Sequence, residues 1–101
     1  MVVTPAAFHQ SLAQSAPPSN LSDALQALWW AGKDDWERAH KIVMESSGEA
    51  SAWVHAYLHR VEGDLGNADY WYRSAGKPAA ADALETEWQR IATALLTDSK
   101  S

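Results

Sequence analysis

Apolar residues recur every three or four positions through most of this chain, and this spacing limits its fold more narrowly than any other feature. One run places its apolar residues at i, i+3, i+4, i+7 and i+8: Leu21, Ala24, Leu25, Leu28 and Trp29. Such residues share one face of a helix. Apolar and polar residues nowhere alternate with a period of two, as they do in half-buried strands. The sequence therefore predicts an all-α fold.

Capping residues and helix breakers divide this pattern into separate helices. Asn20 and Asp34 each precede an acidic residue by three positions, which resembles a capping box, so we expect helices to begin after them. Asp64 or Asn67 is expected to cap a later helix, which Gly76-Lys77-Pro78 ends. These signals predict helical hairpins at about 21–46 and 49–76. A further helix is predicted at about 79–96.

The length of 101 residues is enough for one domain. We assign residues 21–97 to a single helical domain and residues 98–101 to a frayed tail. Residues 1–20 form an N-terminal extension, in which Thr4 and Pro5 can start a short helix that carries Phe8 and Leu12 on one face.

The charge pattern excludes several classes of partner and location. Thirteen acidic residues outnumber eight lysines and arginines, and the basic residues are scattered along the chain. Nucleic-acid binding needs clustered basic residues, so we expect none. The sequence shows neither a secretory signal pattern nor an apolar run of the ~18 residues that cross a membrane. It also lacks cysteine, which predicts a cytoplasmic protein without disulfides.

A weak internal repeat appears when the chain is shifted by 29 positions. Small residues then match small residues, and large apolar residues match large ones: Ala27 with Ala56, Asp35 with Asp64, Trp36 with Leu65, Ala39 with Ala68, Val43 with Tyr72 and Ser46 with Ala75. Two stacked hairpins with equivalent packing contacts require this kind of match.

The spacing of these residues resembles the tetratricopeptide repeat. Ala56, the turn Gly63-Asp64-Leu65 and then Ala68, Tyr72 and Ala75 reproduce its pattern in one copy. The period is shorter than the family's, and Trp53 lies one place from the expected register of the large aromatic. The run 53–73 is also similar to a family of small bacterial proteins that has no assigned function.

The tetratricopeptide resemblance implies stacked antiparallel hairpins in a right-handed superhelix, closed by the C-terminal helix as a cap. Such domains bind a protein or peptide on the concave face of their first helices. Transferred by position, that groove contains Leu28, Trp53, Tyr57 and Arg60. Two repeats are fewer than a stable stack usually needs. A homodimer, or the N-terminal segment folded over the exposed end, would cover it.

A histidine face on the helix near 49–61 supplies an alternative function. His55, His59 and Glu62 lie at i, i+4 and i+7, so their side chains share one face and could hold a divalent metal. His40 on the preceding helix is a candidate fourth ligand. The competing interpretation makes these histidines core residues that donate to a backbone carbonyl or a neighbouring acid.

The remaining aromatic and charged residues are expected to be structural. Most tryptophans should lie in the core, with one member of Trp29-Trp30 and of Trp71-Tyr72 partly exposed. Arginine side chains are expected to pair with nearby acids, Arg60 with Asp64 and Arg73 with Asp69. Glu85 and Glu87 are assigned to a solvated helix face.

These observations predict a function without catalysis. The sequence contains no phosphate-binding loop and no nucleophile elbow, so we expect no enzyme and no cofactor. The leading prediction is a protein-interaction or scaffolding module. The alternative is a domain that binds a small ligand or a divalent metal through His55, His59, Glu62 and His40.

Overall fold

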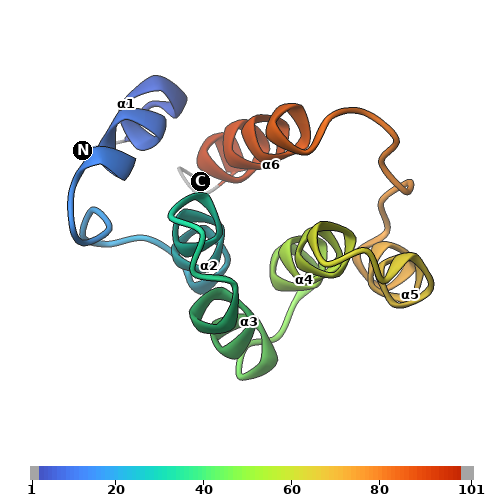
Figure 1. Ribbon diagram of the computed structural model, residues 1–101. Helices are drawn as coiled ribbons and strands as arrows, with labels where there is room; N and C mark the ends of the chain where they lie inside the picture. The colour runs from blue at the N-terminus through green and yellow to red at the C-terminus, as the bar shows by residue number, and fades with distance from the viewer. Residues whose placement is uncertain (1–2, 99–101) are drawn as a thin grey trace.

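The computed structural model describes residues 3–98, which contain six α-helices and one short 3₁₀ helix (Figure 1). These residues contain no strand, so the all-α prediction is confirmed. The elements follow the order α1 (Pro5–Gln10), η1 (Ser11–Ala13), α2 (Asp23–Gly32), α3 (Trp36–Met44), α4 (Glu49–Val61), α5 (Leu65–Ala75) and α6 (Leu84–Asp98). Apart from Asp98, the predicted tail at 98–101 lies outside the described residues.

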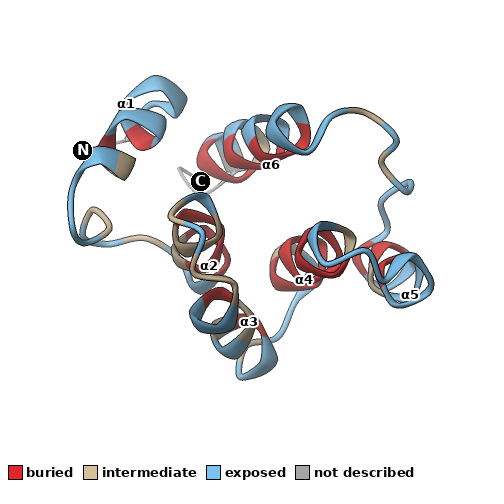
Figure 2. Cartoon of the chain, in the orientation of Figure 1, coloured by how far each residue is buried: buried red, intermediate tan, exposed pale blue. Residues whose placement is uncertain are grey.

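Two helical hairpins, α2 with α3 and α4 with α5, form one side of the molecule, and α6 lies across α2 and α4 (Figure 1). Helix α4 is the most buried element, because every residue from 51 to 59 is buried (Figure 2). Its apolar residues lie around more than one face, so the helix is buried on more than one side.

The turns inside the two hairpins have the same geometry, 29 residues apart. Asp34 and Gly63 have positive φ angles of 63° and 88°. The next residue, Asp35 or Asp64, donates its backbone N–H across 2.9 Å to a carbonyl five residues earlier. Each of these aspartates also accepts a 3.2 Å hydrogen bond from the backbone N–H three residues later. Residues 29 positions apart in the sequence therefore occupy equivalent positions in the two turns.

The two equivalent caps give a matched stability test. Replacing Asp35 or Asp64 with alanine removes the acceptor for an N-terminal N–H of α3 or α5. Each variant is expected to lose about 1 kcal/mol of unfolding free energy, measured by urea denaturation. Near-equal losses follow from the equal geometry, and a loss at one turn only would contradict the equivalence.

Three predicted helix starts were wrong. Helix α2 is capped by Ser22, whose hydroxyl accepts from the Leu25 N–H, while Asn20 turns the chain at a φ of 66°. Helix α3 is capped by Asp35, because Asp34 takes up the positive φ of the turn. Asparagine and aspartate tolerate that conformation better than other residues with side chains.

The third wrong start is that of α6, which begins at Leu84 rather than near residue 79. Residues 77–83 are not helical and cross from the end of α5 to α6 (Figure 1). An extended chain covers about twice the distance per residue that a helix covers. The crossing therefore uses seven non-helical residues, because the same residues in a helix would span only about half the distance. The C-terminal end of α5 agrees with the prediction, since Gly76 adopts a left-handed φ of 70°.

The N-terminal segment packs on the helical domain. Phe8 is fully buried, and its ring stacks on Trp88 of α6 with centroids 5.4 Å apart. The Trp29 indole donates a 2.9 Å hydrogen bond to the Ser11 hydroxyl. Lys33 donates to the Leu12 and Gln14 carbonyls. Residues 3–14 are therefore part of the folded unit.

Half of the tryptophans lie in the core, rather than most of them as the sequence predicts. Trp29, Trp53 and Trp88 are buried, and Trp30, Trp36 and Trp71 are partly buried. Within each adjacent aromatic pair, one side chain enters the core and the other remains partly exposed. Among the described residues, no helix is long and apolar enough to cross a membrane.

Candidate functional site

The residues of the predicted groove lie between α2, α4 and α6. Leu28 is fully buried, and its carbonyl accepts a 2.7 Å hydrogen bond from the Trp88 indole of α6. Trp53 and Tyr57 keep only 8% and 6% of their surfaces exposed. Helix α6 covers the inner face of both hairpins (Figures 1 and 2). These side chains therefore make contacts within the chain.

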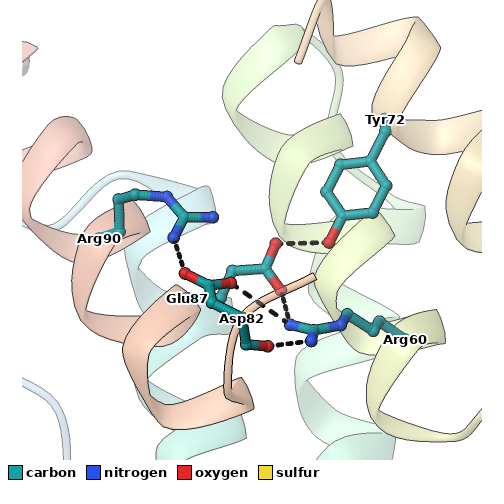
Figure 3. A network of polar contacts seen from close by, with 5 residues as sticks. All are labelled: Arg60, Tyr72, Asp82, Glu87 and Arg90. Atoms are coloured by element: carbon teal, nitrogen blue, oxygen red, sulfur yellow. Dashed lines mark hydrogen bonds and ion pairs between the residues drawn. The ribbon is translucent and has the colours of Figure 1, made fainter. Parts of the chain in front are cut away.

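Arg60, the fourth groove residue, belongs to a buried polar network that links α4, α5 and α6 (Figure 3). Its guanidinium donates across 2.7 Å to Glu87, which has no exposed surface. The Tyr72 hydroxyl donates to the other oxygen of the same carboxylate. Two predictions were therefore wrong: Glu87 does not lie on a solvated face, and Arg60 pairs with Glu87 rather than Asp64.

A second ion pair, between Arg90 and Asp82, lies at the edge of this network. Arg60 also donates to the Asp82 carbonyl, and Arg90 donates to the Asp82 carboxylate (Figure 3). The hydrogen bond from Arg90 lowers the pKa of Asp82. Burial, followed by the bond to Glu87, raises the pKa of Tyr72, so its hydroxyl stays protonated and donates. The network pairs two arginines with two carboxylates and links the helices, although Asp82 Oδ1 is buried without a hydrogen-bond partner among residues 3–98.

A cluster of three histidines lies on the opposite side of α4. His40 comes from α3, and His55 and His59 come from successive turns of α4. One ring nitrogen from each lies within 4.8 Å of the others. The ring centroids are 4.9 Å apart for His40 and His55, 5.2 Å for His40 and His59, and 4.8 Å for His55 and His59. Two helices thus bring three imidazoles to one point.

Neighbouring side chains fix the orientation of each ring. Trp36 stacks on His40 with centroids 4.5 Å apart, and Trp71 stacks on His55 at 3.9 Å. His59 donates through Nδ1 to the Glu62 carboxylate across 2.5 Å. A neutral imidazole that donates from Nδ1 keeps its lone pair on Nε2. Nε2 of His59 is therefore available as a metal ligand or a hydrogen-bond acceptor.

The cluster favours the neutral form of His55 and His40. Burial, followed by the nearby His59 and His40, lowers the pKa of His55 to about 4. Burial and His59 also lower the pKa of His40, while Glu62 acts in the opposite direction. Neutral imidazoles at His40 and His55 supply nitrogen lone pairs without charge repulsion between them.

The shifted pKa of His55 predicts that acid destabilises the metal-free chain. Unfolded His55 takes up a proton near pH 6.5, whereas folded His55 does so only near pH 4. The unfolded state therefore binds more protons between these values, and stability is full above pH 6.5 and falls toward pH 4. The expected loss is about 3 kcal/mol, measured by urea denaturation with a chelator present. His55→Gln should flatten this slope, and an unchanged slope would contradict the assignment.

His40, His55, His59 and Glu62, which were predicted to share a site, lie close together in the structure. Their positions differ from the predicted ones in two respects. His40, predicted as an extra ligand, is one of the three clustered histidines, while Glu62 is bonded to His59. His59, Glu62 and Asp64 form a second group of potential ligands beside the first. The sequence analysis missed the stacking of Trp36 and Trp71. The remaining histidine, His9, lies on α1 against Trp88.

The chain matches no protein-family model, no curated protein sequence and no solved structure.

Proposed function

We propose that this protein binds a divalent transition metal through His40, His55 and His59. The convergence of three imidazoles within 4.8 Å carries this proposal. In a tetrahedral site with metal–nitrogen bonds of about 2.0–2.1 Å, ligand nitrogens lie about 3.3 Å apart. Small ring rotations would bring the three nitrogens to that separation. The role is one of binding rather than catalysis.

The chemistry of the donors supports zinc or a similar borderline ion. Imidazole nitrogen suits Zn²⁺, Ni²⁺, Co²⁺ and Cu²⁺, whereas Mg²⁺ and Ca²⁺ prefer oxygen ligands. Metal-bound histidines usually donate their second N–H to a carboxylate or a carbonyl. The bond from His59 Nδ1 to Glu62 matches this arrangement. Glu62 would therefore orient the His59 ligand.

Equilibrium dialysis of the untagged chain against zinc tests the proposal. We expect one ion per chain, and loss of this ion in His40→Ala, which alters the most exposed of the three histidines. Glu62→Gln should weaken zinc binding by about 10–100-fold, because the His59 ring loses its orienting partner. His9→Ala is the matched control, since His9 lies outside the cluster, and it should bind zinc normally.

Either of two results would overturn the metal site. One is the absence of stoichiometric zinc in the unaltered chain. The other is equal zinc binding by His40→Ala and the unaltered chain. Circular dichroism of each variant separates a lost ligand from a lost fold.

A second candidate function is recognition of a protein or peptide by a tetratricopeptide-like stack, with α6 as its cap. The equal turn geometry of the two hairpins supports this proposal. Because α6 covers the inner face, the partner would bind the outer helices, where Leu65 and Tyr70 of α5 are 62% and 61% exposed. A second copy of the chain is the simplest such partner.

Sedimentation velocity over a range of concentrations tests this second candidate. A dimer that Leu65→Ser weakens, while the fold is retained, would support it. A monomer at every concentration would exclude the homodimer.

A further inference from the structure

A pocket of about 470 Å³ lies between η1, α2, α4 and α6, and Trp36 of α3 also lines it. Its walls are mostly apolar and include Leu12, Leu58 and the aromatic rings of Trp36, Tyr57 and Trp88. This volume lies within the range of about 300–1,000 Å³ that is typical of small-molecule sites.

Tyr57, a residue of the pocket wall, carries a hydroxyl group. Tyr57 lines the pocket and is 6% exposed. Within residues 3–98 its hydroxyl makes no hydrogen bond. The indole N–H groups of the two tryptophans in the pocket wall have partners. Trp36 donates to the Leu58 carbonyl, and Trp88 donates to the Leu28 carbonyl. The hydroxyl of Tyr57 is not sealed from solvent, so water or a ligand in the pocket can bond to it.

Acidic residues outnumber basic ones in the pocket wall. Two of its lining residues are carboxylates, Asp34 from the turn after α2 and Glu85 from α6. Among residues 3–98, His9 is the only basic residue that lines it. Burial, together with the charges of Glu87, Asp34 and Glu85, raises the pKa of Tyr57 to about 12, while the charge of Arg60 acts in the opposite direction. The negative charges therefore act on the pocket interior as well as on its rim.

We propose that this pocket binds a small organic cation, an ammonium or guanidinium group carried on an apolar body. The aromatic faces of Trp36, Tyr57 and Trp88 attract a cation and cover an apolar stem. Asp34 and Glu85 complement the positive charge, and the Tyr57 hydroxyl accepts its N–H. The proposal does not depend on the metal site.

Three probes of the same shape and different charge test the proposal: 2-phenylethylammonium, 2-phenylethanol and phenylacetate. Binding is followed by NMR through the indole N–H signals of Trp36 and Trp88, with the signal of Trp53 as an internal control outside the pocket. A chelator is present, so that the amine cannot bind through a metal. We expect the cation to bind at least about tenfold more tightly than the alcohol, and phenylacetate not to bind.

Conservative variants identify the groups responsible. Asp34→Asn keeps a residue that tolerates the φ of 63°, and Glu85→Gln changes an exposed position, so both should fold. Each is expected to weaken binding of the cation about threefold or more and to leave the alcohol unaffected. Tyr57→Phe should weaken it further. Glu37→Gln, an equal charge change at an exposed residue outside the pocket, is the matched control.

A blocked lysine peptide distinguishes a free cation from a side chain of a partner. Tighter binding of the peptide than of 2-phenylethylammonium would support the same chemistry and assign its source to a protein. Equal binding of the cation and the alcohol would overturn the proposal. The same conclusion would follow if Asp34→Asn and Glu85→Gln bound the cation as the unaltered chain does, or if no probe shifted the Trp36 and Trp88 signals.

Discussion

Replacing Glu87 with alanine is expected to lower the free energy of unfolding by about 3–5 kcal/mol. Glu87 has no exposed surface and accepts from both Arg60 and Tyr72. Its loss leaves the Arg60 guanidinium without its carboxylate partner, with only the Asp82 carbonyl as acceptor, and leaves the Tyr72 hydroxyl without the acceptor that Glu87 supplies. The cost comes mainly from this uncompensated buried charge, because the net contribution of an intact buried ion pair is small. Urea denaturation followed by circular dichroism measures the loss.

Glu85→Ala is the matched control for this substitution. It removes the same side chain two residues earlier in α6, where Glu85 is exposed, and should change stability by no more than about 0.5 kcal/mol. The double variant Arg60→Met/Glu87→Leu removes both charges and should recover much of the loss. A loss below about 1 kcal/mol for Glu87→Ala would mean that water reaches this carboxylate.

Replacing Phe8 with alanine is expected to cost about 3–5 kcal/mol. Phe8 is fully buried, and its ring stacks on Trp88. Removing it opens a cavity between α1 and α6, and the short α1 has no other fully buried side chain to hold it. Fewer helix contacts would then support Trp88, whose indole bonds to Leu28.

Gln10→Ala, an exposed change in the same short helix, controls for effects on helix propensity and should be nearly neutral. The measurement is again the urea midpoint. A loss of less than about 1 kcal/mol for Phe8→Ala would contradict the packing of the N-terminal segment on α6.

The helices could be predicted because their signals are local. The spacing of Leu21 to Trp29 and the breakers at Gly48 and Gly76 depend on neighbours within a few residues. The starts of α2 and α6 were wrong for the same reason. Whether Asn20 or Ser22 caps a helix, and how far the chain must travel from α5 to α6, depend on the packing of whole helices.

The burial of Glu87 was not predicted, because its charge indicated exposure to solvent. Glu87 lies three residues after Leu84 and four before Ile91, so its spacing placed it on the apolar stripe of α6. The partner that permits its burial, Arg60, is 27 residues away in sequence. A charged residue at a stripe position is a usable signal for a buried ion pair, but the identity of its partner requires the tertiary structure.

The histidine site was predictable in part. His55 and His59 share a face of one helix by spacing alone, and His40 was a candidate fourth ligand because it lies on the preceding helix. The spacing also placed Glu62 among the ligands, whereas the structure bonds it to His59 Nδ1. The stacking of Trp36 on His40 and of Trp71 on His55 comes from packing between helices, which no local pattern encodes.

The electronic absorption spectrum of the Co²⁺-loaded chain tests the central claim most directly. Cobalt replaces zinc in nitrogen-ligand sites, and its visible bands report coordination number and geometry. Binding by His40, His55 and His59 predicts intense visible bands that saturate at one equivalent, persist in His9→Ala and disappear in His40→Ala. A spectrum that matches hexaaquo cobalt at every ratio, or bands that survive in His40→Ala, would contradict the site.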